Sequence, residues 1–182
     1  MADTNKQFDE IIARCRKVFE AKMQDYGASW RIFRLQGITD QVYIKCCNIR
    51  QRQETGVSLV GDDIVGNLRA IVNYGVMAII QDRKGYADEV DIPNDEAMQL
   101  YDQVIGEVKD LMILKNHDYG EAWRGMSEEG IVDMILAKVV RIKTILANDG
   151  KTIASEGVEG NYFDIINYAV FNLIKMTVNE KE

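Results

Sequence analysis

The sequence predicts an all-α protein made of two copies of a three-helix unit, packed as a pseudo-two-fold helical bundle. The first observation is a repeat: residues 22–31 (KMQDYGASWR) recur as residues 115–124 (KNHDYGEAWR), 93 positions later. The second is the single proline in 182 residues, which favours long uninterrupted helices. The third is that no segment alternates apolar and polar residues as a half-buried strand does. A repeat of this kind indicates a tandem duplication.

The correspondence between the copies extends on both sides of this motif. Apolar, glycine and polar positions keep the same offset, which grows by one residue after a single insertion. The matched pairs include Phe8 and Tyr101, Phe19 and Met112, Gly37 and Gly130, Lys45 and Lys138, Gly66 and Gly160, Asn73 and Asn167, and Tyr74 and Tyr168.

The first predicted helix of each copy has apolar residues at spacings of three and four, which places them on one helical face. They are Phe8, Ile11, Ile12, Cys15, Val18 and Phe19, and then Tyr101, Val104, Ile105, Val108, Leu111 and Met112. Gly27 and Gly120 are expected to end these helices, because glycine adopts the left-handed C-cap conformation without steric cost. Trp30 and Trp123 follow, where each ring can fold back onto the bundle. A helix terminator with an aromatic lid is one sufficient explanation of the motif.

The second helix is predicted at about residues 40–52 and 133–147, with Asp40 and Asp133 as N-caps. The third is predicted at about residues 62–82 and 155–177. Because it is the most apolar element of each copy, we expect it at the centre of the bundle.

The domain organisation follows from the repeat. Residues 1–83 form copy one, residues 84–94 a charged linker, and residues 95–182 copy two, with Asn94 or Asp95 capping its first helix. Since a three-helix unit of this size is only marginally stable alone, the copies are expected to share one core and to resemble a homodimer.

Composition narrows the class of protein. The net charge of −7 disfavours binding to nucleic acids and to anionic membrane surfaces. Three cysteines, two of them adjacent, fit neither a disulfide framework nor a zinc site, and His117 is the only histidine. No apolar stretch of about 18 residues or signal-peptide core is evident, so we expect a reduced cytoplasmic protein.

The two copies differ in their charged residues. Copy two carries Lys138 and Arg141 on its second helix, and Glu156, Glu159 and Asp164 along its third. The corresponding residues of copy one are Lys45, Asn48, Asp62, Val65 and Ala70. This asymmetry predicts that copy two holds the functional site and that copy one is a degenerate support.

Two interpretations of these charges stay open. In the first, Lys138 and Arg141 pair with Asp164 and Glu159 only to hold two helices in register, since buried ion pairs occur without any function. In the second, the carboxylates bind Mg²⁺, which prefers oxygen ligands, and the basic side chains neutralise phosphate oxygens.

The pattern D-Y-G-x-x-W, then K-x-x-R, then E-x-x-E-x4-D-x-x-N-Y-A resembles the nucleotide-modification-associated domain family 1, once per copy. Copy two is the closer match, at Asp118, Tyr119, Gly120, Trp123, Lys138, Arg141, Glu156, Asp164, Asn167 and Tyr168. The resemblance implies a role in nucleotide metabolism. The helical pattern is also similar to the all-α MazG and dimeric dUTPase pyrophosphohydrolases, which surround Mg²⁺ with carboxylates. The chain departs from them, because its preceding helix offers only Asp133 and position 160 is glycine.

The leading hypothesis is a nucleotide-metabolism protein, in the form of a Mg²⁺-dependent pyrophosphohydrolase-like enzyme acting on a nucleoside phosphate. Glu156, Glu159 and Asp164 would bind Mg²⁺, and Lys138 and Arg141 the phosphates. Lys115, Tyr119, Trp123 and Arg124 would border the pocket. The alternative is a non-catalytic helical module that binds nucleotides or proteins, with a purely structural set of ion pairs. The expected assembly is a monomeric pseudo-dimer or a homodimer.

Overall fold

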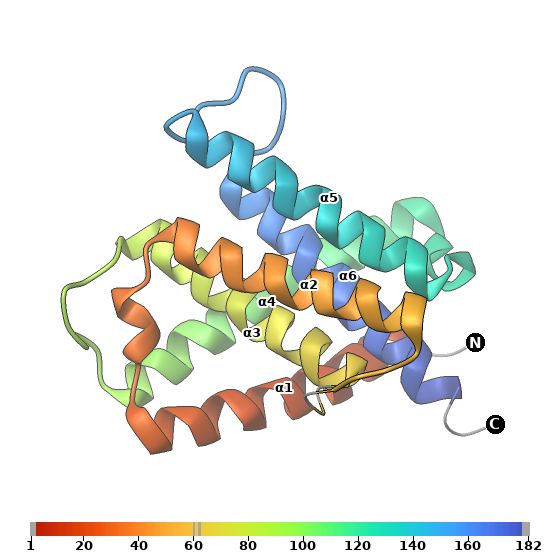
Figure 1. Ribbon diagram of the computed structural model, residues 1–182, viewed down its shortest axis with the longest axis horizontal. Helices are drawn as coiled ribbons and strands as arrows, with labels where there is room; N and C mark the ends of the chain where they lie inside the picture. The colour runs from red at the N-terminus through yellow and green to blue at the C-terminus, as the bar shows by residue number, and fades with distance from the viewer. Residues whose placement is uncertain (1–2, 60, 62, 180–182) are drawn as a thin grey trace.

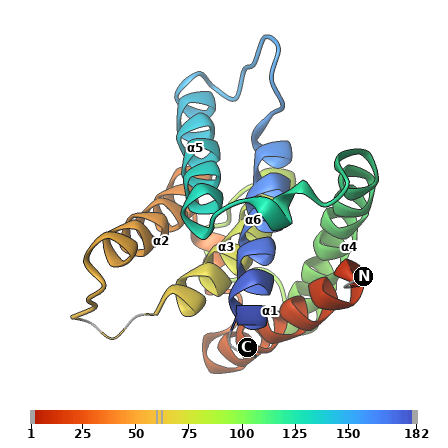
Figure 2. The same cartoon turned by 90° about the vertical axis from the view of Figure 1, so that its right-hand side faces the viewer.

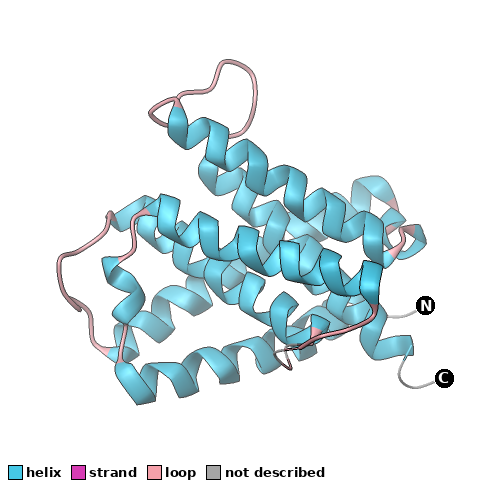
Figure 3. Cartoon of the chain, in the orientation of Figure 1, coloured by secondary structure: helices cyan, strands magenta, loops and turns pink. Residues whose placement is uncertain are grey.

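The computed structural model describes residues 3–59, 61 and 63–179 (Figure 1). The described residues form six α-helices and two short 3-10 helices and contain no strand (Figure 3), which confirms the all-α prediction. The elements are α1 (Thr4–Tyr26), η1 (Ser29–Ile32), α2 (Leu35–Thr55), α3 (Ile64–Lys84), α4 (Asn94–Tyr119), η2 (Ala122–Gly125), α5 (Glu128–Ala147) and α6 (Val158–Asn179).

The two copies pack as the repeat predicts, with α1, α2 and α3 corresponding to α4, α5 and α6. The third helices, α3 and α6, pack against each other at the centre, and α2 lies beside α5. Helix α1 contacts α6 and α4 contacts α3, so the first helix of each copy packs on the third helix of the other. Figure 2 shows α3 and α6 between the α2–α5 pair and the α1–α4 pair. The copies therefore share one core.

Side-chain hydrogen bonds repeat with the same symmetry. Asn73 on α3 donates from Nδ2 to the carbonyl oxygen of Cys15 at 3.1 Å, and Asn167 on α6 donates to that of Val108 at 3.3 Å. All four positions correspond in the duplication. The pseudo-two-fold relation thus holds for buried polar contacts as well as for helices.

The repeated motif ends α1 and α4 as the sequence predicts. Gly27 and Gly120 occupy the C-cap positions with positive φ, 67° and 59°; Gly120 adopts the predicted left-handed conformation, whereas Gly27, with ψ of −165°, adopts a different one. The next residues form η1 and η2, which turn Trp30 and Trp123 back into the core, where they are 3% and 5% exposed. The aromatic lid is confirmed in both copies.

The centre of the bundle requires a close approach between α3 and α6. A Cβ atom added at Gly75 would lie 2.7 Å from Cγ1 of Ile166, so only glycine fits there without displacing that side chain. Helix α3 has the length and hydropathy of a membrane span, but 67% of that stretch is buried inside the bundle. It is the core helix that its apolar sequence predicts, as in a soluble helical domain.

The helix starts differ from the sequence prediction. Helices α2 and α5 begin at Leu35 and Glu128, so Asp40 and Asp133 lie inside helices and the N-cap assignments are wrong. The physical reason is that Ile38 and its equivalent in copy two are fully buried, and burying them extends each helix over the preceding glycine.

Two further predicted helix starts also need correction. Pro93, and not Asn94 or Asp95, occupies the N-cap of α4, and Asn94 instead donates to the carbonyl oxygen of Met23 at 2.8 Å. Helix α6 begins at Val158 and not at residue 155. The predicted start of α3 at Asp62 lies outside the described residues.

Candidate functional site

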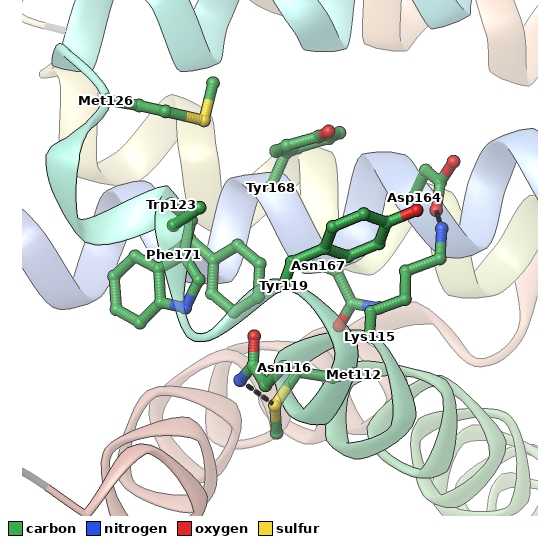
Figure 4. Close-up of a pocket in the computed structure, with 11 residues that line it drawn as sticks. Met112, Lys115, Asn116, Tyr119, Trp123, Met126, Asp164, Asn167, Tyr168 and Phe171 are labelled. Atoms are coloured by element: carbon green, nitrogen blue, oxygen red, sulfur yellow. Dashed lines mark hydrogen bonds and ion pairs between the residues drawn. The ribbon is translucent and has the colours of Figure 1, made fainter.

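A cavity of about 320 Å³ lies in copy two between α4, η2 and α6 (Figure 4). We call it the second-copy pocket. Its volume is within the range of small-molecule sites, about 300–1,000 Å³. It is lined by Met112, Lys115, Asn116, Tyr119, Ala122, Trp123, Met126, Asp164, Asn167, Tyr168 and Phe171.

Aromatic side chains form one end of this pocket. Trp123 stacks on Phe171 with ring centroids 4.4 Å apart and planes 3° from parallel. The indole Nε1 of Trp123 is buried and has no hydrogen-bond partner. Tyr119 is 73% exposed, and it lies with Tyr168 between the aromatic end and the charged end (Figure 4). The pocket therefore offers aromatic surface to a planar ligand.

The other end of the pocket is a buried carboxylate held by two lysines. Asp164, which is 7% exposed, accepts from the Nζ atoms of Lys115 at 2.5 Å and Lys138 at 2.7 Å, one on each oxygen. Burial by itself would lower the pKa of Lys115, but the hydrogen bond to Asp164 and its charge outweigh burial and raise that pKa. Asp164 and the two lysines sum to one positive charge, and the charge of Glu156 also acts on Lys115 and raises its pKa.

The structure brings four of the predicted site residues together at this pocket: Lys115, Tyr119, Trp123 and Asp164 line it. Lys138 reaches it through Asp164. These residues come from α4, η2, α5 and α6, so the site depends on the packing of all three helices of copy two.

Arg124 and Arg141 lie elsewhere. The guanidinium of Arg124 packs over the Trp123 ring at 4.3 Å and donates to Glu121 and Gln7 at 2.7 and 2.8 Å, outside the pocket lining. Arg141 is exposed and makes no ion pair with any residue in the described ranges. The proposed pairing of Arg141 with Asp164 or Glu159 is therefore wrong, since Lys115 occupies that role.

The three carboxylates predicted to bind Mg²⁺ are not gathered into one site. Both oxygens of Glu159 accept from Arg83, at 2.9 and 2.7 Å, and Glu156 is exposed in the loop before α6. Both oxygens of Asp164 are bonded to lysines. Within the part of the chain that the structure describes, no three His, Cys, Asp or Glu side chains form a group that could hold a metal ion. The donors as arranged do not fit a three-carboxylate Mg²⁺ cage.

Several lining residues were not identified from the sequence. Met112, Asn116, Met126 and Phe171 belong to the pocket, and nothing about their residue types marks them. The repeat was the one sequence feature that pairs these residues with positions in copy one, and the structure shows that those counterparts also line a cavity.

The fold and site define a class: a duplicated all-α protein in which a repeated helix-end motif builds an aromatic pocket beside buried charges. The chain belongs to the family described as nucleotide modification associated domain 1, which matches residues 22–81 and 115–176, once in each copy. No curated protein and no solved structure matches the chain.

Proposed function

We propose that the second-copy pocket binds a nucleotide, with the base among the aromatic side chains and the phosphate beside Lys115 and Lys138. The observation that carries the proposal is the juxtaposition, in a single cavity, of aromatic side chains with Lys115 and with Asp164, the buried carboxylate that holds Lys115 and Lys138. The family's description, which associates the domain with nucleotide modification, supports the ligand class.

The aromatic end suits a base. The Trp123 ring is covered by Phe171 on one face and by Arg124 on the other. The base would therefore stack on Tyr119 or Tyr168. Such stacking contributes about 1–3 kcal/mol per base and accepts any base, because every base has a π face. The amide of Asn116 adds a polar group that can orient the ring.

The charged end suits a phosphate. An ammonium has three donors, so Lys115 and Lys138 each keep two after bonding to Asp164. Asp164 fixes the two ammonium groups in place and lowers the local charge to one positive unit. We propose binding as the function of this arrangement, because among the described residues Asp164 is the one carboxylate that lines the pocket, and both of its oxygens are occupied by lysines.

A thermal-shift series with nucleoside mono-, di- and triphosphates, with and without Mg²⁺, tests the proposal. A ligand that binds only the folded state raises its melting temperature. We expect a shift for the wild type and for Arg141→Met, whose replaced side chain lies outside the pocket, and a lost shift for Lys115→Met. Equal responses from both variants, or no response from the wild type, would contradict the proposal.

The structural alternative has its own support, because Asp164, Lys115 and Lys138 already satisfy one another. If they serve only as a strut between α4, α5 and α6, replacing all three with apolar residues should leave stability unchanged or higher, with no effect on ligands. If they serve the ligand, the triple variant should fold and lose nucleotide binding.

The proposed setting is the cytoplasm, where free cysteines stay reduced. The proposed partner is a nucleotide or another small phosphorylated molecule and not a nucleic acid, because the chain is acidic. The assembly is proposed to be a monomeric pseudo-dimer or a homodimer. A Mg²⁺-dependent hydrolase activity stays a hypothesis, and the same thermal-shift series tests its metal requirement.

A further inference from the structure

Copy one contains a cavity of its own, of about 390 Å³, between α1, η1 and α3. We call it the first-copy pocket. It is lined by Val18, Phe19, Lys22, Met23, Tyr26, Ser29, Trp30, Phe33, Gly66, Ala70, Asn73, Tyr74 and Met77. The sequence predicts that copy one is a degenerate support, yet the cavity of copy one is at least as large as the cavity of copy two.

The two pockets are built from equivalent positions. Lys22, Tyr26, Trp30, Asn73 and Tyr74 correspond to Lys115, Tyr119, Trp123, Asn167 and Tyr168, with no change of residue type. The remaining shared positions change from Phe19, Met23, Ser29, Phe33, Ala70 and Met77 to Met112, Asn116, Ala122, Met126, Asp164 and Phe171. The duplication has therefore preserved a pocket and not only a scaffold.

Both pockets have an unused donor at the same place. Trp30 is 3% exposed, and its Nε1 is buried without a hydrogen-bond partner, as is that of Trp123. Leaving a buried donor unpaired is unfavourable by about 1–3 kcal/mol. The same unfavourable feature occurs at the equivalent position of both copies, so the duplication has kept a buried, unpaired indole donor behind the wall of each cavity.

The decisive difference between the pockets is one carboxylate. Ala70 stands where copy two has Asp164, and none of the described residues that line the first-copy pocket is Asp or Glu. Lys22 is exposed at its edge and makes no ion pair with any residue that the structure describes, whereas Lys115 is bound to Asp164. An ammonium with three unused donors favours an anionic group more strongly than one already paired with a carboxylate.

We infer that the first-copy pocket is a second ligand site, which takes a planar aromatic molecule carrying a phosphate group bound by Lys22. The inference takes its ligand class, a nucleoside monophosphate, from the proposed function, and adds a second site with a stronger preference for the anion. In the second-copy pocket Asp164 already neutralises part of the lysine charge, so that site discriminates less against the uncharged nucleoside.

The two tryptophans allow each pocket to be observed separately, since the chain contains no others. The variant Trp123→Phe reports only on Trp30 in the first-copy pocket, and Trp30→Phe reports only on Trp123. Each is titrated with the four common nucleoside monophosphates, the parent nucleosides and inorganic phosphate, with indole fluorescence as the signal and circular dichroism as the check of folding.

We expect Trp123→Phe to respond to at least one monophosphate and to bind it at least about tenfold more tightly than the parent nucleoside, a ratio equal to about 1.4 kcal/mol. Adding Lys22→Met should remove this preference. A Trp30 signal that no monophosphate changes, while the Trp123 signal responds, would overturn the second site and leave the proposed function intact. If a monophosphate changes the Trp30 signal and leaves the Trp123 signal unchanged, the proposed function of the second-copy pocket is overturned and the first-copy site stands.

Exchanging the carboxylate between the copies provides a matched test. In the Trp123→Phe background, Ala70→Asp should pair with Lys22 and weaken monophosphate binding toward that of the nucleoside. In the Trp30→Phe background, Asp164→Ala should strengthen the preference for the monophosphate. If both exchanges leave the ratio of nucleotide to nucleoside affinity unchanged, the assignment of the charge preference to this position is wrong. Inorganic phosphate separates an anion site from one that also requires the ring.

Discussion

Adding one hydroxyl group at Phe8 should stabilise the protein, and this prediction tests the duplication at the level of a single hydrogen bond. Asn73 Oδ1 accepts from the hydroxyl of Tyr101 at 2.9 Å, whereas Oδ1 of the equivalent Asn167 is buried without a partner. Phe8 stands at the position of Tyr101 in the other copy. Because the copies are related by a pseudo-two-fold, the para position of the Phe8 ring should face Asn167.

The expected magnitude follows from the hydrogen bond alone. Phe8 is fully buried, so the substitution Phe8→Tyr brings a hydroxyl out of water, and its bond to the orphaned acceptor should leave a net gain of about 0.5–1.5 kcal/mol. The reverse change, Tyr101→Phe, orphans Asn73 Oδ1 and should destabilise the protein by about 1–3 kcal/mol. For a chain of this length, each kcal/mol changes the melting temperature by about 2–4 °C.

Urea unfolding of the wild type, the two single variants and the double variant measures both effects. As a control, Phe8→Tyr in an Asn167→Ala background should lose its gain, because the acceptor is gone. If Phe8→Tyr destabilises the protein while Tyr101→Phe has no effect, the two copies do not share this buried contact and the pseudo-two-fold relation fails in the core.

Two further predictions concern titratable groups. Burial raises the pKa of Cys15 and of Cys46 to about 12 and also blocks access to both thiols. A thiol reagent at pH 8 should therefore modify only the exposed Cys47 in the native protein, and all three cysteines in denaturant. Rapid labelling of all three cysteines in the native protein would refute this prediction. The hydrogen bond and charge of Arg83 lower the pKa of Glu107 below its ordinary value of 4.5. The Glu107–Arg83 ion pair therefore stabilises the folded protein above pH 4.5, and this stabilisation is lost as the pH falls through the pKa of Glu107 in the folded state. Glu107→Gln should therefore be less stable than the wild type near neutral pH and converge with it in acid, as measured by urea unfolding at each pH; a constant difference would contradict the assignment.

The repeat predicted the fold because it constrains packing directly. Matched apolar faces, glycine helix ends and the tryptophan lids recur in both copies, and each is a local consequence of residue type. The helix starts were harder to predict, because Gly37 is an ordinary turn signal in sequence. Only tertiary burial of Ile38 makes helix the better conformation there.

The charged contacts could be predicted only in part. Glu159 and Asp164 are five residues apart, which places them about 140° apart around α6. Glu159 therefore reaches Arg83 on α3, while Asp164 reaches Lys138 on α5 and Lys115 on α4. Sequence spacing shows which residues share a helix, but the partners supplied by other helices depend on how the copies pack.

The most direct test of the account is the nuclear magnetic resonance spectrum of the indole N–H groups of Trp30 and Trp123 during a nucleotide titration. The two signals, assigned with Trp30→Phe and Trp123→Phe, come from buried indole donors that have no hydrogen-bond partner among the described residues. Each belongs to a side chain that lines one pocket. The account predicts that a nucleoside monophosphate moves the Trp123 signal in a saturable manner, and that Lys115→Met weakens this response. If saturating nucleotide leaves the Trp123 signal where it is in the free protein, the second-copy pocket is not a nucleotide site.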